Sequence, residues 1–161
     1  MHSTPAFEAK ICPPQELAAR IARLARPLVF TNGVFDILHR GHVTYLAQAR
    51  ALGASLVVAV NSDASVKRLN KGGNRPLNAL ADRLALIAAL EATSLATWFE
   101  EDTPLNLILA VKPEVLVKGG DWKPETMAGA AEVKSWGGSV HSIPFAHQRS
   151  TTALIGRIRG S

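Results

Sequence analysis

Short continuous apolar runs, separated by segments with helical spacing, constrain the fold of this chain more than any other feature of its sequence. The plainest run is Leu56–Val60, in which apolar residues follow one another without alternating with polar ones. Such a run is typical of a strand that is buried on both faces, as in a parallel sheet covered by helices. Comparable strands are expected at Leu28–Asn32, Leu95–Phe99, Val115–Val117 and Val140–Ile143.

The segments between these runs carry helix signals. Helices are expected between Pro13 and Pro27, from Gly41 to Leu52, from Ala79 to Ala92, from Leu105 to Val111, from Pro124 to about Trp136, and from Ser150 or Thr151 onward. Asn78 is expected to cap the helix that follows it, and Thr103 to cap a helix with Pro104 in its first position. Strands that alternate with helices predict an α/β fold, a Rossmann-like doubly wound parallel sheet in three α/β/α layers.

Length and composition predict a single globular domain. The chain has 161 residues, of which 47% are hydrophobic and 19% charged, and one domain usually takes roughly 100–200 residues. An N-terminal helical extension is expected at residues 1–27, ahead of a core at residues 28–161. Cys12 is the single cysteine, which excludes an internal disulfide and fits a reducing compartment. No apolar run approaches the ~18 residues of a membrane span, and the N-terminus lacks a signal-peptide pattern, so a cytoplasmic location without membrane contact is expected.

The basic balance of the chain indicates a small anionic ligand rather than nucleic acid. Lysine and arginine number 18 against 13 aspartate and glutamate, which gives a formal net charge of +5. These cations are scattered, and the aromatic residues, at 6% of the chain, do not accompany them. Nucleic-acid binding calls for a continuous basic stripe with interleaved aromatics. A small polyanionic substrate explains local basic clusters equally well.

Polar clusters follow the expected strands directly, and this places the candidate site. In open parallel sheets, ligands bind beyond the carboxyl ends of the strands. Four clusters occupy such positions: 31–42, 61–63, 118–122 and 148–152. A further loop, Lys71–Pro76, combines two glycines, a proline and two cations, and we expect it to fold over a triphosphate and exclude water.

The strongest motif is Thr-Asn-Gly-Val-Phe-Asp-Ile-Leu-His-Arg-Gly-His at residues 31–42. It contains two histidines three residues apart, His39 and His42, at the start of an expected helix. Gly41 lacks a side chain, so a phosphate chain could approach the backbone there, close to the unpaired N–H groups of the helix start. The imidazoles could then donate hydrogen bonds as negative charge redistributes in a transition state. A zinc site is the alternative for two such histidines, but Asp36 is the only acidic residue nearby.

This segment resembles the nucleotide-binding signature, with its His-x-Gly-His motif, of the cytidylyltransferase-like nucleotidyltransferase superfamily. Five later segments occur in the order found in one of its families, the D-glycero-β-D-manno-heptose 1-phosphate adenylyltransferases: 61–69, 75–78, 100–104, 118–125 and 150–152. The resemblance covers about Leu28 to Ile158. It therefore implies that residues 28–161 are a catalytic core.

The family resemblance implies an enzyme that transfers AMP from ATP to a heptose 1-phosphate, releasing pyrophosphate and supplying ADP-heptose for the lipopolysaccharide inner core. Mg²⁺ is expected as a cofactor held mainly by the ATP phosphates and water, without protein metal ligands. Many members carry a sugar-kinase domain ahead of this one, so a stand-alone form with a separate kinase is expected here. Relatives often form dimers, which leaves a homo-oligomer open.

The residue pattern and the resemblance together assign the candidate site residues. Catalytic roles are expected for His39, His42 and Lys71. Nucleotide contacts are expected from Thr31, Asn32, Gly33, Phe35, Asp36, Gly41, Arg75, Lys118, Gly119, Asp121, Ser150, Thr151 and Thr152. Substrate contacts are expected from Asn61, Asp63, Arg83 and Trp122.

Plainer interpretations remain beside these assignments. Residues 150–152 could simply cap a helix, residues 118–121 could form an ordinary turn, and Arg83 could pair with Asp82 or Glu91 on its own helix. The family often has glycine followed by isoleucine or cysteine before Ser-Thr-Thr, where this chain has Gln148-Arg149, and Arg149 could add to phosphate binding. The alternative functions are a CTP-dependent transferase acting on a polyol or amino-alcohol phosphate, a non-catalytic nucleotide-binding module, and an RNA-binding fragment of synthetase type.

Overall fold

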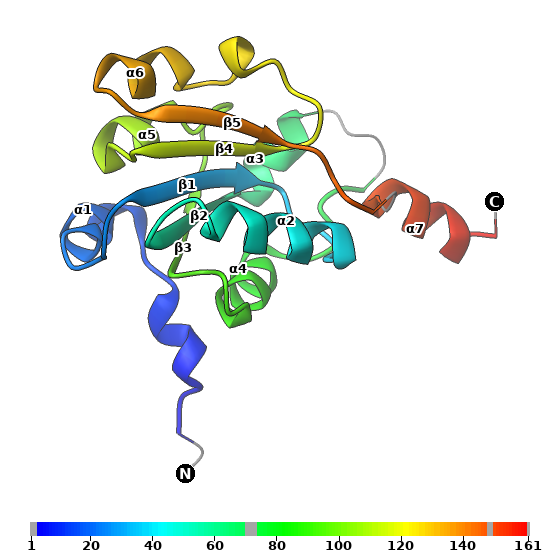
Figure 1. The fold of residues 1–161 in the computed structure, drawn as a ribbon. Helices are drawn as coiled ribbons and strands as arrows, with labels where there is room; N and C mark the ends of the chain where they lie inside the picture. The colour runs from blue at the N-terminus through cyan, green and yellow to red at the C-terminus, as the bar shows by residue number, and fades with distance from the viewer. Residues whose placement is uncertain (1–2, 70–73, 148–149, 161) are drawn as a thin grey trace.

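The computed structural model describes residues 3–69, 74–147 and 150–160 and shows a parallel sheet between two layers of helices (Figure 1). Its five strands lie in the order β3-β2-β1-β4-β5, and every neighbouring pair is parallel. The strands are β1 (Leu28–Gly33), β2 (Ser55–Asn61), β3 (Leu95–Phe99), β4 (Val115–Gly119) and β5 (Ser139–Ile143). The expected doubly wound, three-layer fold is confirmed.

Short and medium helices connect the strands. The α-helices are α1 (Leu17–Ile21), α2 (Arg40–Arg50), α3 (Asp63–Arg68), α4 (Leu80–Ala89), α5 (Leu105–Val111), α6 (Ala130–Ser135) and α7 (Thr151–Ile158). Three 3-10 helices add to them: η1 (Ala6–Lys10), η2 (Pro14–Glu16) and η3 (Pro124–Thr126). None of the helices in the described parts of the chain is long and apolar enough to span a membrane.

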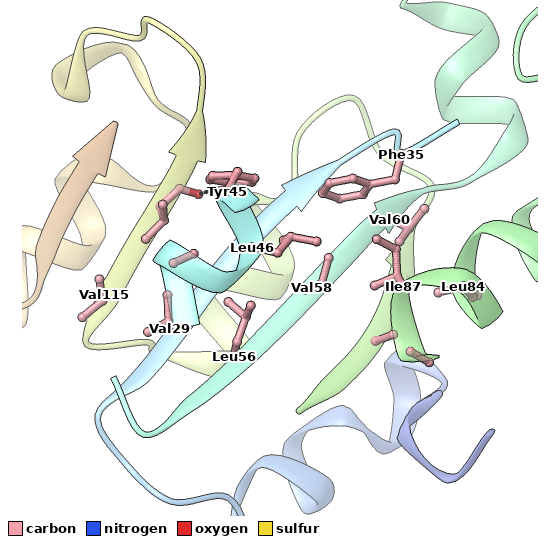
Figure 2. Close-up of a cluster of buried hydrophobic side chains, with 14 residues drawn as sticks. Val29, Phe35, Tyr45, Leu46, Leu56, Val58, Val60, Leu84, Ile87 and Val115 are labelled. Carbon is pink, nitrogen blue, oxygen red and sulfur yellow. Dashed lines mark hydrogen bonds between the residues drawn. The ribbon is translucent and has the colours of Figure 1, made fainter. Parts of the chain in front are cut away.

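Two apolar cores lie on opposite faces of the sheet, because successive strand side chains point to opposite sides. On one face, α2 and α4 pack Leu46 and Ile87 against strand residues such as Val58 (Figure 2). On the other face, α1, α5 and α6 cover a second set that includes Phe30 and Val57. All the described residues of β2 are buried, which explains the continuous apolar run in this strand.

The N-terminal segment packs against the sheet and covers part of the edge strand β3. Ile11 forms a parallel bridge with Ala96, and Cys12 donates its backbone N–H to the Ala96 carbonyl at 2.8 Å. The side chains of Cys12, Leu17 and Ile21 are buried in the second core. A covered edge is less able to pair with the strand of another chain.

Three local expectations are wrong. The helix expected from Pro124 to Trp136 is instead η3 followed by α6, because Gly129 adopts a left-handed conformation (φ 85°) between them. Asn78 does not cap α4: the N-cap is Ala79, and the Asn78 side chain donates to the Asp36 carbonyl instead. Pro104, not Thr103, occupies the N-cap position of α5.

Candidate active site

A cavity of about 510 Å³ opens at the carboxyl ends of β1 and β4, where the strand order of the sheet reverses. This is the position at which open α/β sheets bind their ligands. The described residues that line it come from the ends of both strands and from the loops and helix starts that follow: Asn32, Gly33, Val34, Phe35, Asp36, His39, His42, Tyr45, Val66, Arg75, Lys118, Gly119, Trp122, Phe145, Ser150, Thr151 and Thr152.

The two motif histidines stack on each other at the start of α2. Their ring centroids are 3.8 Å apart with an angle of 21° between the planes. His39 is the N-cap of α2 with an extended backbone, and His42 lies in the first turn of this helix. Burial lowers the pKa of His39, and burial followed by the charge of His39 lowers the pKa of His42 to about 4. Both imidazoles are therefore neutral at pH 7 and can each donate one N–H hydrogen bond.

The absence of a side chain at position 41 has a different structural reason from the one expected. A Cβ at this position would lie 2.9 Å from Cε1 and 3.0 Å from Nδ1 of His39. The missing side chain makes room for the His39 ring, and Gly41 itself is buried outside the cavity lining.

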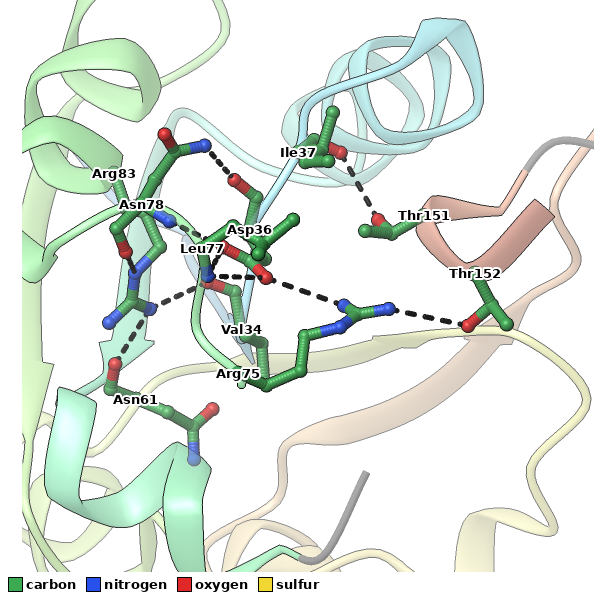
Figure 3. A network of polar contacts seen from close by, with 10 residues as sticks. All are labelled: Val34, Asp36, Ile37, Asn61, Arg75, Leu77, Asn78, Arg83, Thr151 and Thr152. Carbon is green, nitrogen blue, oxygen red and sulfur yellow. Dashed lines mark hydrogen bonds and ion pairs between the residues drawn. The ribbon is translucent and has the colours of Figure 1, made fainter. Parts of the chain in front are cut away.

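Asp36 organises the segment before α4 (Figure 3). Its carboxylate is almost fully buried and accepts the backbone N–H groups of Leu77 and Asn78, each at 2.9 Å to Oδ1. Arg75 approaches Oδ2 of the same carboxylate at 3.4 Å. Because its acceptor positions are occupied by these donors, Asp36 acts as an anchor for residues 75–78.

The Arg75 guanidinium extends from Asp36 to the start of α7 (Figure 3). Its Nη2 lies 3.4 Å from Oγ1 of Thr152, and Thr151 donates its hydroxyl to the Ile37 carbonyl at 3.3 Å. The loop after β1, the segment before α4 and the start of α7 therefore meet at one wall of the cavity. Both contacts of Arg75 are long, so an anionic ligand could compete for this cation.

Arg83 lies behind this wall with a fully buried side chain. Its Nε donates to the Asn78 carbonyl at 3.0 Å, and its Nη1 donates to the carbonyls of Val34 and Asn61, both at 2.8 Å. Its Nη2 pairs with Asp63 at 2.7 Å. The guanidinium thus joins three separate segments at the carboxyl edge of the sheet.

This burial corrects both sequence-based interpretations of Arg83. The side chain has no exposed surface to offer a substrate, and its ionic partner is Asp63 rather than Asp82 or Glu91. Thr31 is corrected in the same way: its side chain is fully buried, and its hydroxyl is hydrogen-bonded to Tyr45. Both side chains are fully buried beside the cavity in this structure and do not form part of its described lining.

Trp122 forms part of the rim of the cavity on the side of β4. Its side chain is half exposed, yet Nε1 donates to the Gly119 carbonyl at 3.2 Å and the backbone N–H donates to Ser142 Oγ at 3.1 Å. The Lys118 ammonium lies 4.1 Å from the centroid of the indole, within the range of a cation–π interaction. These contacts hold the exposed aromatic surface in place without a ligand.

The cavity gathers most of the expected site residues and leaves some out. Among the described residues, six expected ones lie outside the lining: Thr31, Gly41, Asn61, Asp63, Arg83 and Asp121. Lys71 lies outside the described residues. Four lining residues were not expected: Val34, Tyr45, Val66 and Phe145. Phe145 lies two residues after the end of β5, so the rule that directed attention to the other strand ends could have found it.

The lowered pKa of His42 predicts that the protein loses stability in mild acid. An unfolded His42 binds its proton near pH 6.5, whereas the folded one does so near pH 4. Between these values the unfolded state binds more protons, so the free energy of unfolding falls as the pH falls, by about 3 kcal/mol. Urea unfolding of the native protein and of His42→Gln from pH 7.5 to 4 measures this, and parallel pH curves for the two proteins would contradict it.

Two residues at the start of α7 are expected to have different roles, Ser150 in capping the helix and Thr152 in binding a ligand. Ser150 is the N-cap, and its Oγ accepts the Ala153 N–H at 3.0 Å. Ser150→Ala should weaken the helix by about 1 kcal/mol, visible as faster amide exchange in α7. Thr152→Ala should instead reduce affinity for ATP and leave that exchange unchanged. An effect of Thr152→Ala on exchange alone would reduce Thr152 to a structural residue.

Comparison with known proteins agrees with this geometry. A sequence model of the cytidylyltransferase-like family matches residues 30–155. The chain is 60% identical over 159 residues to a D-beta-D-heptose 1-phosphate adenylyltransferase of Bordetella bronchiseptica, and the match covers 98% of each chain. It is 54% identical over 145 residues to the bifunctional protein HldE of Escherichia coli, covering 89% of this chain and 30% of that protein.

Solved structures extend the similarity to the fold. A lipopolysaccharide core biosynthesis protein of Thermoplasma volcanium is 31% identical with a TM-score of 0.60, and the match covers 76% of this chain and 98% of that one. A pantoate-beta-alanine ligase of Francisella tularensis, at 13% identity, has a TM-score of 0.58 over 88% of this chain and 68% of its own. The second similarity concerns the fold alone.

Proposed function

This chain belongs to the cytidylyltransferase-like family, and we propose that it transfers AMP from ATP to D-glycero-β-D-manno-heptose 1-phosphate. The products are ADP-heptose, a precursor of lipopolysaccharide, and pyrophosphate. The observation that carries the proposal is the stacked pair His39–His42 in a cavity at the reversal point of the sheet. The Bordetella relative, a D-beta-D-heptose 1-phosphate adenylyltransferase, is the basis for the sugar substrate in this proposal.

The reaction needs no covalent intermediate on the protein. An oxygen of the sugar phosphate attacks the α-phosphorus of ATP and forms the new P–O bond. The bond from the α-phosphorus to the oxygen that bridges to the β-phosphorus breaks, and pyrophosphate leaves with that electron pair. Such transfers are catalysed mainly by positioning and by stabilising charge on the phosphoryl oxygens.

The residues that line the cavity suit these two tasks. Neutral His39 and His42 can donate hydrogen bonds to oxygens of the transferring phosphoryl group, where negative charge redistributes. Arg75 can neutralise the leaving pyrophosphate, with the hydroxyls and backbone N–H groups at the start of α7 beside it. Lys118 and Trp122, which line the cavity on the side of β4, offer an ammonium and an aromatic surface to the rest of the nucleotide.

Mg²⁺ fits this site as a companion of ATP. Asp36 is the one carboxylate in the described lining of the cavity, and its oxygens already accept N–H groups. Triphosphate oxygens and water would therefore be the main ligands of the ion, an arrangement common for Mg²⁺. The ion would neutralise charge on the phosphates.

We further propose a cytoplasmic location, which the buried thiol of Cys12 supports.

Turnover across a panel of nucleotides and sugar phosphates tests the function. ATP and CTP are each paired with heptose 1-phosphate, with another sugar 1-phosphate and with glycerol 3-phosphate, and pyrophosphate release is followed. The combination of ATP with heptose 1-phosphate should give the highest kcat/KM, by at least about tenfold. A higher kcat/KM with CTP and glycerol 3-phosphate would contradict this proposal and indicate a cytidylyltransferase instead.

Arg75 should discriminate between ATP and AMP. Arg75→Ala removes a cation that the β- and γ-phosphates of ATP can reach and that AMP does not need. Affinity for a non-hydrolysable ATP analogue should fall about tenfold, the scale of one charge-assisted hydrogen bond, with a much smaller loss for AMP. Calorimetric titrations measure both, with Lys134→Ala in α6 as a control for the loss of one positive charge. Equal losses for the two ligands would place Arg75 away from the leaving group.

A further inference from the structure

Aromatic rings surround the imidazole of His42 on several sides. Phe35, from the loop after β1, meets it at a centroid distance of 5.4 Å and an angle of 71°. Phe145, from the loop after β5, meets it at 6.0 Å and 86°, and also packs on Tyr45 at 5.7 Å. His39 stacks on it at 3.8 Å. These distances and angles are those of favourable aromatic contacts.

Three glycines make this ring cluster sterically possible. A Cβ at Gly33 would lie 2.9 Å from the Phe35 ring, and a Cβ at Gly119 would lie 2.9 Å from the Phe145 ring. Gly41 leaves the same kind of space for His39.

The backbone at Phe35 is also adapted to the position of its ring beside His42. Phe35 is held at φ 49°, a left-handed conformation that bulky residues rarely adopt. Its ring is buried against the side of His42. Such a conformation persists only where the surroundings enforce it. Three glycines and an unfavourable backbone conformation therefore accommodate the rings around His42.

Phe145 is the exposed member of this ring cluster. Its side chain is 39% exposed, and it lies in the cavity wall between His42, Tyr45 and Gly119. Resting on the proposed function, we propose that Phe145 is a positioning residue for His42: its ring, together with that of Phe35, fixes the orientation of the imidazole and excludes water from it.

The surroundings of His42 support a role for an apolar neighbour. Nδ1 of His42 is buried and has no hydrogen-bond partner among the described residues. The backbone of Ile37 raises the His42 pKa, but this is the smallest of the three effects on it, so packing contributes more than polar contacts to the surroundings of the ring. Besides His42, the ionisable groups in the described lining of the cavity are His39 at the N-cap of α2, Tyr45 within α2, Asp36, Arg75 and Lys118. Of these, His39 is the one whose charge acts on His42, and burial has the larger effect on the His42 pKa. Removing the Phe145 ring would expose His42 to more water and so weaken the effect of burial on its pKa.

The test combines a titration of His42 with steady-state kinetics. Phe145→Ala opens the ring cluster, Phe145→Leu keeps apolar bulk without the ring, and Phe145→Tyr keeps the ring. Phe7→Leu, in η1 away from the cavity, is the matched control. The Cε1–H resonance of His42, assigned with His42→Gln, is followed by NMR in the free proteins from pH 3.5 to 8. kcat and the KM for ATP are measured at pH 7.5.

Phe145→Ala should raise the pKa of His42 from about 4 toward 6.5 and lower kcat about tenfold, while the KM for ATP changes less than about threefold. The His42 pKa and the kcat of Phe145→Leu should lie between those of Phe145→Ala and the native protein. Phe145→Tyr and Phe7→Leu should match the native protein in both. An unchanged His42 titration in Phe145→Ala, or a rise in KM at constant kcat, would overturn the proposal and make Phe145 a nucleotide contact or a spectator. The titration needs no substrate, so it gives a result even if the native protein fails to use heptose 1-phosphate.

Discussion

Replacing His42 with alanine is expected to lower kcat by at least about a hundredfold, the scale of losing one preorganised hydrogen-bond donor to a transition state. His42 is held by His39 on one face and by two phenylalanine rings, so its N–H group needs little reorganisation when charge develops. Affinity for ATP should fall much less, because the interaction strengthens as the transition state forms. Single-turnover kinetics with ATP and heptose 1-phosphate, beside equilibrium binding of an ATP analogue, separate the two effects.

Two further variants make this experiment decisive. His39→Ala should also lower kcat, since it removes both a donor and the ring that stacks on His42. His141→Ala is the control, because His141 lies in β5 outside the cavity lining and contacts Ser139. If kcat is unchanged in both His39→Ala and His42→Ala, the histidine pair has no part in the chemistry.

The second large effect concerns stability. Arg83→Met keeps much of the side-chain volume but removes every donor, which leaves the carbonyls of Val34, Asn61 and Asn78 and the carboxylate of Asp63 without this partner. The Asp63 carboxylate is 42% exposed and can be solvated, but the three carbonyls would lose a buried donor, and a buried acceptor left without a partner typically costs about 1–3 kcal/mol. We expect a loss of about 3 kcal/mol or more in the free energy of unfolding, or failure to fold. Urea unfolding followed by circular dichroism measures it.

Arg68→Met provides the comparison for this prediction. Arg68 pairs with Asp102 on the surface, where both side chains are largely exposed, and such pairs contribute at most about 1 kcal/mol. A similar small loss for both variants would mean that the carbonyls around Arg83 find water when the guanidinium is gone.

The sequence predicted the sheet well because its signal is local. A strand buried on both faces must be apolar throughout, and β2 has that pattern and that burial. Helix ends were less predictable because they depend on partners distant in sequence. Asn78 has the chemistry of a cap, but Asp36, 42 residues earlier, engages it. The helix expected from Pro124 was interrupted at Gly129, where a Cβ would lie 2.7 Å from Ile108.

The candidate site was predicted where polar residues follow strands and was missed where its lining is apolar. Asn32, Gly33 and Lys118 all lie at strand ends and line the cavity as expected. Tyr45 and Val66 have the sequence pattern of ordinary core residues and reach the cavity only because α2 and α3 pack beside it. Arg83 shows the converse error: a charged residue on a helix suggests a surface or a ligand, and the fold buries it completely.

Arg83 holds its loops mainly through main-chain oxygens, which every amino acid provides. The side chain at position 34, for example, could therefore change in related proteins without loss of the bond that fixes the loop. Selection for a different acceptor substrate could then change the side chains of this cavity wall, while the loop backbones that Arg83 holds keep their positions. Families with this arrangement would be expected to diverge fastest in the loop side chains next to the arginine and slowest at the arginine itself.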